Sequence, residues 1–161
     1  MIYGIGIDVL KAERVQRVLE KHGDRFVRHL LMPEERAQLE RTARPARFLA
    51  MHFAAKEAIV KAMGTGFAHG VWIRDVGMVQ NEWGRPEVIY SQRGNKLRNQ
   101  MGIGDGHVTL TDEAGLVVAV AVLLRAAAPK RRASSRRAAA SRAADPRTTA
   151  RPKLKRTAKS K

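Results

Sequence analysis

The apolar and polar positions of residues 1–125 follow two periods, one typical of helices and one typical of strands. The helical pattern covers residues 11–22, 33–41, 45–63 and 91–101. The strand pattern covers residues 2–7, 71–80, 87–90, 107–111 and 116–124. Because strands and helices mix without a strict βαβ alternation, the sequence predicts an α+β fold, with an antiparallel sheet packed against a long helix.

Helix caps and turns separate these segments. Gly23 is expected to close the first helix and Gly64 to end the longest one, since glycine is the usual residue just past a helix. Pro33, followed by two glutamates, suits a helix start. Residues 81–86 (NEWGRP) predict a hairpin turn between two strands.

Charge divides the chain into two parts. Residues 1–125 hold 18 Lys and Arg against 14 Asp and Glu, whereas residues 126–161 hold 13 against one, Asp145. The second part has Leu154 as its only large apolar residue, so it cannot bury enough surface to offset the entropy of ordering. We therefore expect one domain at residues 1–125 and a disordered basic tail at 126–161.

Composition excludes several kinds of protein. The absence of cysteine excludes disulfide scaffolds, cysteine-ligated zinc and thiol nucleophiles. The first ten residues lack a basic segment and reach Asp8 too early for a signal peptide. The longest apolar run, residues 116–124, is far shorter than the roughly 20 residues that span a bilayer. We expect a cytoplasmic protein without a membrane span.

Charged residues interrupt the apolar face of the longest helix. On a helical wheel that face holds Phe48, Leu49, Phe53, Ile59, Val60 and Met63. Lys56 falls in its middle, Glu57 at its edge, and Lys61 one turn beyond Glu57. In the ordinary interpretation, Glu57 and Lys61 form a surface ion pair and Lys56 extends along its apolar stem to reach water.

The helix is followed at once by Gly64, Thr65 and Gly66. Two glycines around a hydroxyl residue can make a loop whose backbone N–H groups approach a phosphate. The same residues also suit a plain helix stop. A carboxylate, two lysines and this loop within a short segment together indicate a phosphate site more specifically than any one of them.

A second carboxylate, Asp8, follows the first predicted strand. Mg²⁺ is usually bound by one or two protein carboxylates, with substrate phosphates and waters completing its shell. Asp8 and Glu57 would form such a site if the fold brings them together. The alternative is that Asp8 is the N-cap of the helix that begins near Lys11.

Three blocks of residues keep a common order and spacing over essentially all of residues 1–125. They are residues 4–9 (GIGIDV) with Glu13 and Arg14, residues 48–66 with FAAKEA at 53–58 and GTG at 64–66, and residues 84–86 (GRP) with residues 107–111 (HVTLT). In these blocks the chain resembles holo-acyl-carrier-protein synthase, the small bacterial branch of the phosphopantetheinyl transferases. The second block is the most specific of the three.

The resemblance implies a site and an assembly. It implies a 4'-phosphopantetheinyl transferase-like fold, with Mg²⁺ on Asp8 and Glu57 and Lys61 on the phosphates. The coenzyme A residues that it implies are Lys56, Lys61, Gly64, Thr65, Gly66, Pro86, His107 and Thr109. Members of this length are similar in being homotrimers that bind the coenzyme where two subunits meet. The family often has arginine where this chain has His52, so the resemblance extends no phosphate contact to that position.

The resemblance also implies a reaction. A serine hydroxyl of an acyl carrier protein would attack the β-phosphorus of coenzyme A, with Asp8, Glu57 and Lys61 as the catalytic residues. The reaction would release 3',5'-ADP and convert apo carrier to holo carrier for fatty acid biosynthesis. The serine proton needs an acceptor, which could be Glu57 or a metal-bound water held by Asp8.

Basic residues on the first predicted helix suggest how a carrier would dock, since acyl carrier proteins are strongly acidic as a family. The candidate docking strip consists of Arg14, Arg17, Lys21, Arg25 and Arg28. The first three share one helical face, and Gly23 is expected to break the helix before the last two. The strip would steer an acidic partner in a salt-dependent way, although a solvated basic face is the ordinary alternative.

Two predictions compete with those above. His107 could be a strand-end histidine that makes only local hydrogen bonds. The tail at 126–161 resembles nucleic-acid-binding extensions in composition, so the chain could be a binding module whose domain is a scaffold. A third possibility is that the tail tethers the enzyme to a large acidic synthase.

Overall fold

The computed structural model describes residues 1–127, and the predicted basic tail lies outside the described residues from residue 128 onward. The strands are β1 (Ile2–Lys11), β2 (Val76–Gln80), β3 (Pro86–Tyr90), β4 (Ile103–Glu113) and β5 (Leu116–Arg125). The helices are α1 (Ala12–Leu30), α2 (Pro33–Leu39), α3 (Pro45–Met63) and α4 (Gln92–Gln100).

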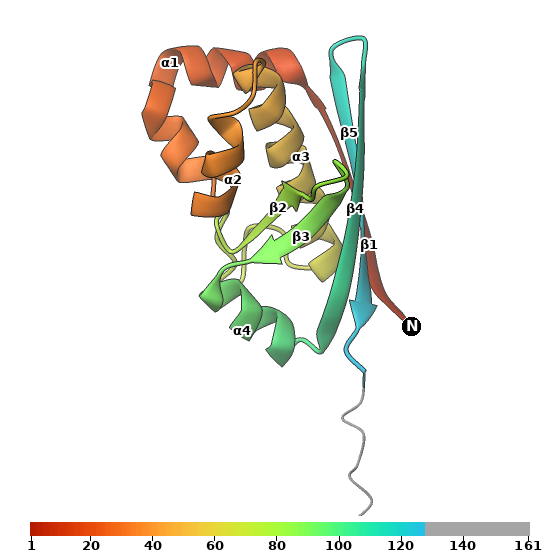
Figure 1. Cartoon of the computed structure of the whole chain (residues 1–161). Helices are drawn as coiled ribbons and strands as arrows, with labels where there is room; N and C mark the ends of the chain where they lie inside the picture. The colour runs from red at the N-terminus through yellow and green to blue at the C-terminus, as the bar shows by residue number, and fades with distance from the viewer. Residues whose placement is uncertain (128–161) are drawn as a thin grey trace, which may run out of the picture. The chain divides into compact units, whose positions relative to one another are not determined.

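The strands form one antiparallel sheet in the order β1-β5-β4-β3-β2. The helices lie on one side of the long strands β1, β5 and β4, and α3 packs against them (Figure 1). The predicted α+β class, with a long helix on an antiparallel sheet, is therefore confirmed.

Four elements differ clearly in length from the sequence prediction. The strand predicted at 107–111 is the longer β4, Ile103–Glu113, because it pairs with β5 along nearly its whole length. β1 continues past Ile7 to Lys11 because it pairs with β5 as far as Leu116. The 71–80 segment becomes a strand only at Val76, since Asp75 closes a turn before it by accepting a 2.7 Å hydrogen bond from the Trp72 N–H. α1 kinks at Gly23, where the expected break occurs with φ of 49°, and then continues to Leu30.

Helix α3 is the centre of the core and is buried over more of its circumference than the predicted single face. The additional buried residues are mostly alanines, namely Ala50, Ala54, Ala55, Ala58 and Ala62. Small side chains let neighbouring elements approach the helix backbone closely. The close approach is what sets the position of strand β1.

Strand β1 lies directly on the backbone of α3 because it presents glycines to it. A Cβ added at Gly6 would lie 2.0 Å from the Ala58 carbonyl oxygen, and one at Gly4 would lie 2.1 Å from that of Ala62. No larger residue fits at such distances. The GIGID segment therefore brings Asp8 next to the last turns of α3.

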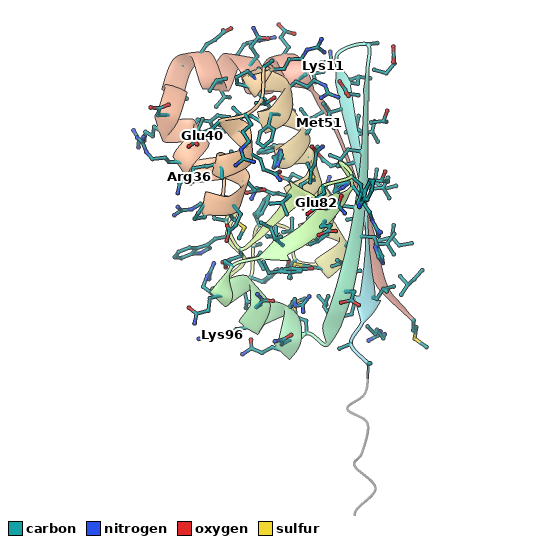
Figure 2. The ribbon with its side chains drawn as sticks, in the orientation of Figure 1. Lys11, Arg36, Glu40, Met51, Glu82 and Lys96 are labelled. Atoms are coloured by element: carbon teal, nitrogen blue, oxygen red, sulfur yellow. The ribbon has the colours of Figure 1, made fainter. Side chains whose placement is uncertain are left out.

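Within residues 1–127 no helix covers the opposite face of the long strands (Figure 1), and its side chains project outward (Figure 2). Ile5, Ile7 and Val9 of β1 are exposed by 57%, 55% and 56%. Ile7 pairs with Val120, and Val120 pairs with Thr109, so these three residues share this outer face. No helix of the described residues is long and apolar enough to cross a membrane.

Candidate active site

Asp8 and Lys61 meet where β1 crosses α3. The Lys61 ammonium Nζ lies 2.7 Å from Asp8 Oδ1 and donates a 3.2 Å hydrogen bond to the Ile7 carbonyl oxygen. The alternative role of Asp8 as a helix N-cap is wrong, because Asp8 lies inside β1 and the N-cap of α1 is Lys11. Strand β1 therefore places Asp8 next to α3, the helix that bears Glu57.

Glu57 completes this group, which we call the open cluster: Asp8, Glu57 and Lys61. Partial burial raises the pKa of Glu57, repulsion from Asp8 raises it further, and Lys61 opposes both. Lys61 directs its ammonium to Asp8 across the interface, so the ordinary i,i+4 ion pair with Glu57 does not form among the described residues. Two carboxylates and one ammonium leave the open cluster with a net negative charge that attracts cations.

The donor set of the open cluster fits a magnesium ion. Hard cations such as Mg²⁺ take carboxylate oxygens and keep several ligands from water or phosphate. Within residues 1–127 no group of three or more His, Asp or Glu side chains is placed to hold a metal. The two carboxylates of the open cluster would thus leave most of the ion's shell to substrate phosphates and water.

Lys56 occupies a different place from the one the resemblance implies. Its side chain is fully buried, its ammonium lies 2.7 Å from Glu35 Oε2, and it donates to the Val76 carbonyl oxygen at 2.7 Å. The expectation that Lys56 reaches water along its apolar stem is wrong. Because its ammonium is enclosed by protein acceptors, the structure does not bring Lys56 to a coenzyme site.

We call Lys56 and Glu35 the closed cluster. Glu35 accepts hydrogen bonds from the N–H groups of Met32 (2.8 Å) and Met78 (3.1 Å), and it is itself fully buried. Burial raises the pKa of Glu35 and lowers that of Lys56, while their mutual attraction opposes both shifts. The sequence patterns did not single out Glu35. The one signal for it is its place three residues after Met32, where a helix begins and a glutamate can accept a hydrogen bond from the N-cap N–H.

The loop after α3 does not offer its backbone donors freely. Gly64 adopts the left-handed conformation with φ of 79° and caps the helix. The N–H groups of Thr65 and Gly66 both donate to the Val60 carbonyl oxygen at 3.2 Å. These donors thus already close the helix, as the plain helix-stop interpretation expects, so a phosphate cradle built from them needs a rearrangement.

Two residues of the third sequence block, His107 and Thr109, lie on the other side of the sheet from Asp8. Residues 81–86 form the predicted turn, and Pro86 begins β3. Arg85 Nη2 lies 3.4 Å from His107 Nδ1, so His107 has the local contact that its ordinary interpretation expects. His107 and Thr109 are exposed on the outer face, whereas Asp8 pairs with fully buried Ala119 on the helix-covered face. One chain does not bring these residues to the open cluster.

The docking strip is present on α1. All of its members are exposed: Arg14, Arg17, Lys21, Arg25 and Arg28. Arg17 pairs with Glu13 at 2.6 Å, and Arg28 has only a distant contact with Asp24 at 4.0 Å. Most of the strip's positive charge is therefore available to a partner.

His52, where the family often has arginine, is a core residue here. Its ring stacks on Phe48 with centroids 3.8 Å apart, and its Nδ1 donates to the Phe48 carbonyl oxygen at 2.9 Å. Burial lowers the pKa of His52 to about 4, so the ring is neutral at pH 7. His52 thus stabilises the helix without presenting a charge to a phosphate.

Comparison with known proteins supports the fold and the resemblance of the three blocks. Residues 4–121 match the 4'-phosphopantetheinyl transferase superfamily. The chain is 41% identical over 123 residues to a holo-[acyl-carrier-protein] synthase of Nitrosospira multiformis, covering 76% of this chain and 98% of that protein. The crystal structure of the Neisseria meningitidis synthase superposes with a TM-score of 0.73 at 36% identity, covering 78% of this chain and all of the other. The Bacillus anthracis synthase, solved with coenzyme A (3',5'-ADP), gives 0.64 at 30% identity, covering 79% and 99%. The resemblance drawn from the three blocks is confirmed.

Proposed function

The chain belongs to the 4'-phosphopantetheinyl transferase superfamily, and we propose on that basis that it moves 4'-phosphopantetheine from coenzyme A to a serine of an acyl carrier protein. The product would be a holo carrier of the kind used in fatty acid biosynthesis, with 3',5'-ADP released. The observation that carries this proposal is the open cluster, where two carboxylates and a lysine meet at the surface.

Asp8 and Glu57 are the residues that would hold Mg²⁺. When bound, the ion would neutralise charge on the pyrophosphate of coenzyme A as the phosphorus–oxygen bond breaks. Its positive charge would also relieve the repulsion between the two carboxylates that now raises the pKa of Glu57. The fit rests on the donor chemistry of this pair.

Lys61 and Glu57 supply the remaining chemistry. Lys61 has an exposed fraction of 47%, so its ammonium can exchange Asp8 for a phosphate oxygen while staying near the reacting centre. As the bond from the serine oxygen to phosphorus forms, the serine proton must leave. The acceptor would be Glu57 or a water held by Asp8, since both carboxylates lie at the reacting centre.

We propose a homotrimer in which a second copy completes the site. The open cluster lies on the covered side of the sheet, whereas His107 and Thr109 lie on the apolar outer face. Burying Ile5, Ile7 and Val9 against another copy would remove exposed apolar surface and carry His107 to a neighbour's open cluster. Light scattering should give three times the chain mass for the wild type and a smaller assembly for Ile7→Glu. A wild-type monomer that retains transfer would contradict the shared site.

The reaction itself is tested by the mass of a carrier. Apo acyl carrier protein incubated with coenzyme A, Mg²⁺ and this chain should gain one phosphopantetheine, and 3',5'-ADP should appear in equal amount. Chelation of the metal should stop both. A carrier that keeps its mass under all conditions would overturn the proposed function.

A further inference from the structure

Lys56 and Glu57 are neighbours on α3, so the rotation of that helix about its axis sets the direction of both side chains. Successive residues of an α-helix point about 100° apart. Lys56 points into the closed cluster, and Glu57 points into the open cluster. A turn of α3 that displaced Lys56 would therefore also displace Glu57 and Lys61 relative to Asp8.

The contact with β1 restrains the distance of α3 from the sheet more than it restrains the rotation. Gly4 and Gly6 present no side chain to the helix, and the carbonyl groups that they approach belong to Ala58 and Ala62. Glycine and alanine offer few projections that could interlock. Burial of apolar surface is also non-directional. A sharper restraint on the rotation requires directional bonds.

Lys56 supplies such bonds on the side of α3 that faces away from β1. Its ammonium lies 2.7 Å from Glu35 Oε2 and donates to the carbonyl oxygens of Val76 at 2.7 Å and Ile73 at 3.2 Å. An ammonium has three donor hydrogens, so these three acceptors use all of them. Because the site is fully buried, a rotation of α3 that broke one bond would leave a polar group without water to replace its partner.

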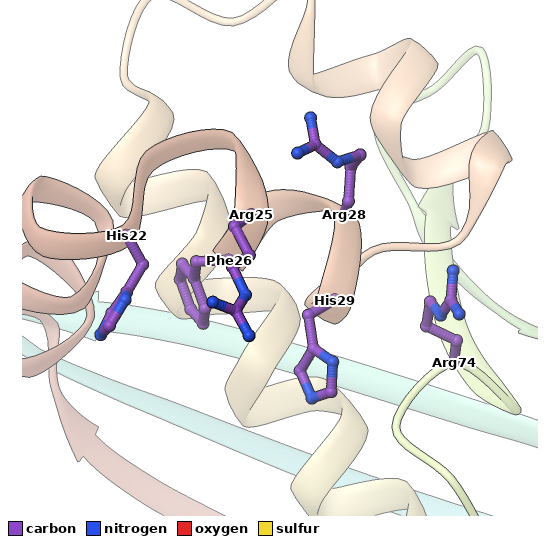
Figure 3. A pocket seen from close by; sticks show the side chains of 6 residues that line it. All are labelled: His22, Arg25, Phe26, Arg28, His29 and Arg74. Carbon is purple, nitrogen blue, oxygen red and sulfur yellow. The ribbon is translucent and has the colours of Figure 1, made fainter.

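The acceptors around Lys56 are themselves held in place. Glu35 accepts hydrogen bonds from the N–H groups of Met32 and Met78, which lie on different elements. Arg74, between the two carbonyl groups in the chain, is exposed and lines an open hollow beside α1 (Figure 3). The segment before β2 thus turns backbone carbonyls toward Lys56 and its charged side chain outward.

Resting on the proposed function, we propose that Glu35 and Lys56 are positioning residues for the transfer reaction. The closed cluster fixes the rotation of α3 and thereby keeps the open cluster assembled. A buried ion pair often stabilises a fold no more than apolar side chains of similar volume do, and its use is then to specify one arrangement. Partners that orient metal ligands typically contribute about 10- to 100-fold in metal affinity or activity.

A double variant separates positioning from stability. Glu35→Leu/Lys56→Met removes both buried charges, so the fold should persist while the directional bonds are lost. Its kcat per folded chain should fall about 10- to 100-fold. The KM for the carrier should stay within about twofold, because the docking strip is unchanged. Ile59→Val is the control: it shortens a fully buried side chain of the same helix, and it should lose stability but keep its kcat.

Binding of Mn²⁺ alone gives a second readout without turnover. Mn²⁺ prefers the same carboxylate and water ligands as Mg²⁺ and is followed directly by electron paramagnetic resonance. The double variant should bind Mn²⁺ about tenfold more weakly than the wild type, and Ile59→Val should match the wild type. If leucine at position 35 prevents folding, Glu35→Gln/Lys56→Met takes its place, because the amide oxygen still accepts from a backbone N–H.

Three results would overturn the inference. They are a folded double variant with the kcat of the wild type, equal Mn²⁺ affinity in the double variant and the wild type, or a loss of kcat in Ile59→Val as large as that in the double variant. A wild type that transfers no phosphopantetheine would contradict the proposed function instead. The Mn²⁺ comparison would then decide the positioning role by itself.

Discussion

Helix α3 contributes one lysine to each of the two clusters. The two lysines are little more than one turn apart, and the clusters have opposite environments. In the closed cluster, Lys56 and Glu35 are fully buried and every close partner is protein. In the open cluster, the side chains of Lys61 and Asp8 are exposed by 47% and 13%. The same residue types thus form a buried ion pair that stabilises the fold in the closed cluster and a candidate reaction centre in the open cluster.

The difference lies in charge balance as well as burial. The closed cluster matches one ammonium with one carboxylate and gives Glu35 two further N–H donors. The open cluster sets one ammonium against two carboxylates, which leaves a charge for a cation to satisfy. A lysine beside a carboxylate therefore indicates chemistry only where the charges are unbalanced and solvent can enter.

The largest expected effect on stability comes from breaking the closed cluster. Lys56→Met leaves Glu35 buried without its counterion, which should lower the free energy of unfolding by about 3–5 kcal/mol in urea titrations. Lys61→Met on the same helix is the matched control. It should cost only about 0.2–1 kcal/mol, since its partner pair is partly exposed.

Replacing both members should restore much of that loss. The double variant Glu35→Leu/Lys56→Met removes both buried charges, so its stability should return toward that of the wild type. Equal losses for Lys56→Met and Lys61→Met would erase the distinction between the clusters.

A smaller effect concerns the pH dependence of the free energy of unfolding. His52 should contribute about 3 kcal/mol to it in total. The pKa of His52 falls from 6.5 to about 4 on folding, so the unfolded chain binds a proton that the folded chain refuses. The stabilisation from neutral His52 is present above pH 6.5 and is lost as the pH falls toward about 4. Unfolding of His52→Leu should lack this part of the slope. Parallel pH curves for the two proteins would contradict the assignment.

Local features of the fold could be predicted from the sequence, whereas contacts between separate elements could not. The bounds of α3, the turn at 81–86 and the break at Gly23 were predictable, because periodicity, glycine and proline act locally. The partner of Lys56 was not, because Glu35 lies on a separate helix and a wheel shows one helix only. The wheel marks Lys56 as unusual, but it cannot show that the partner of its ammonium is Glu35.

The candidate site was predictable in composition but not in arrangement. The wheel and the GIGID block brought Asp8, Glu57 and Lys61 into one hypothesis, and the structure brings Asp8 and Lys61 into contact. That His107 and Thr109 face away from them depends on the pairing register, which no single segment encodes. The occupied N–H groups of Thr65 and Gly66 likewise depend on the exact cap geometry.

The smallest expected effect probes repulsion inside the open cluster. Asp8→Asn should lower the pKa of Glu57 toward its usual value, because a neighbouring negative charge is removed and Lys61 is released. The pKa should stay above the ordinary value, since burial is the larger cause. Carbon-detected NMR titration of the Glu57 carboxyl measures it. No shift would mean that the two carboxylates do not interact.

The most direct test of the central claim is the mass of apo acyl carrier protein after incubation with coenzyme A, Mg²⁺ and either wild type or Glu57→Gln. The open cluster predicts one added phosphopantetheine with the wild type and a rate lower by on the order of 10²–10³ with the variant. The thermal unfolding of the variant should match that of the wild type, since Glu57 is outside the closed cluster. Transfer by Glu57→Gln at the wild-type rate would contradict the account.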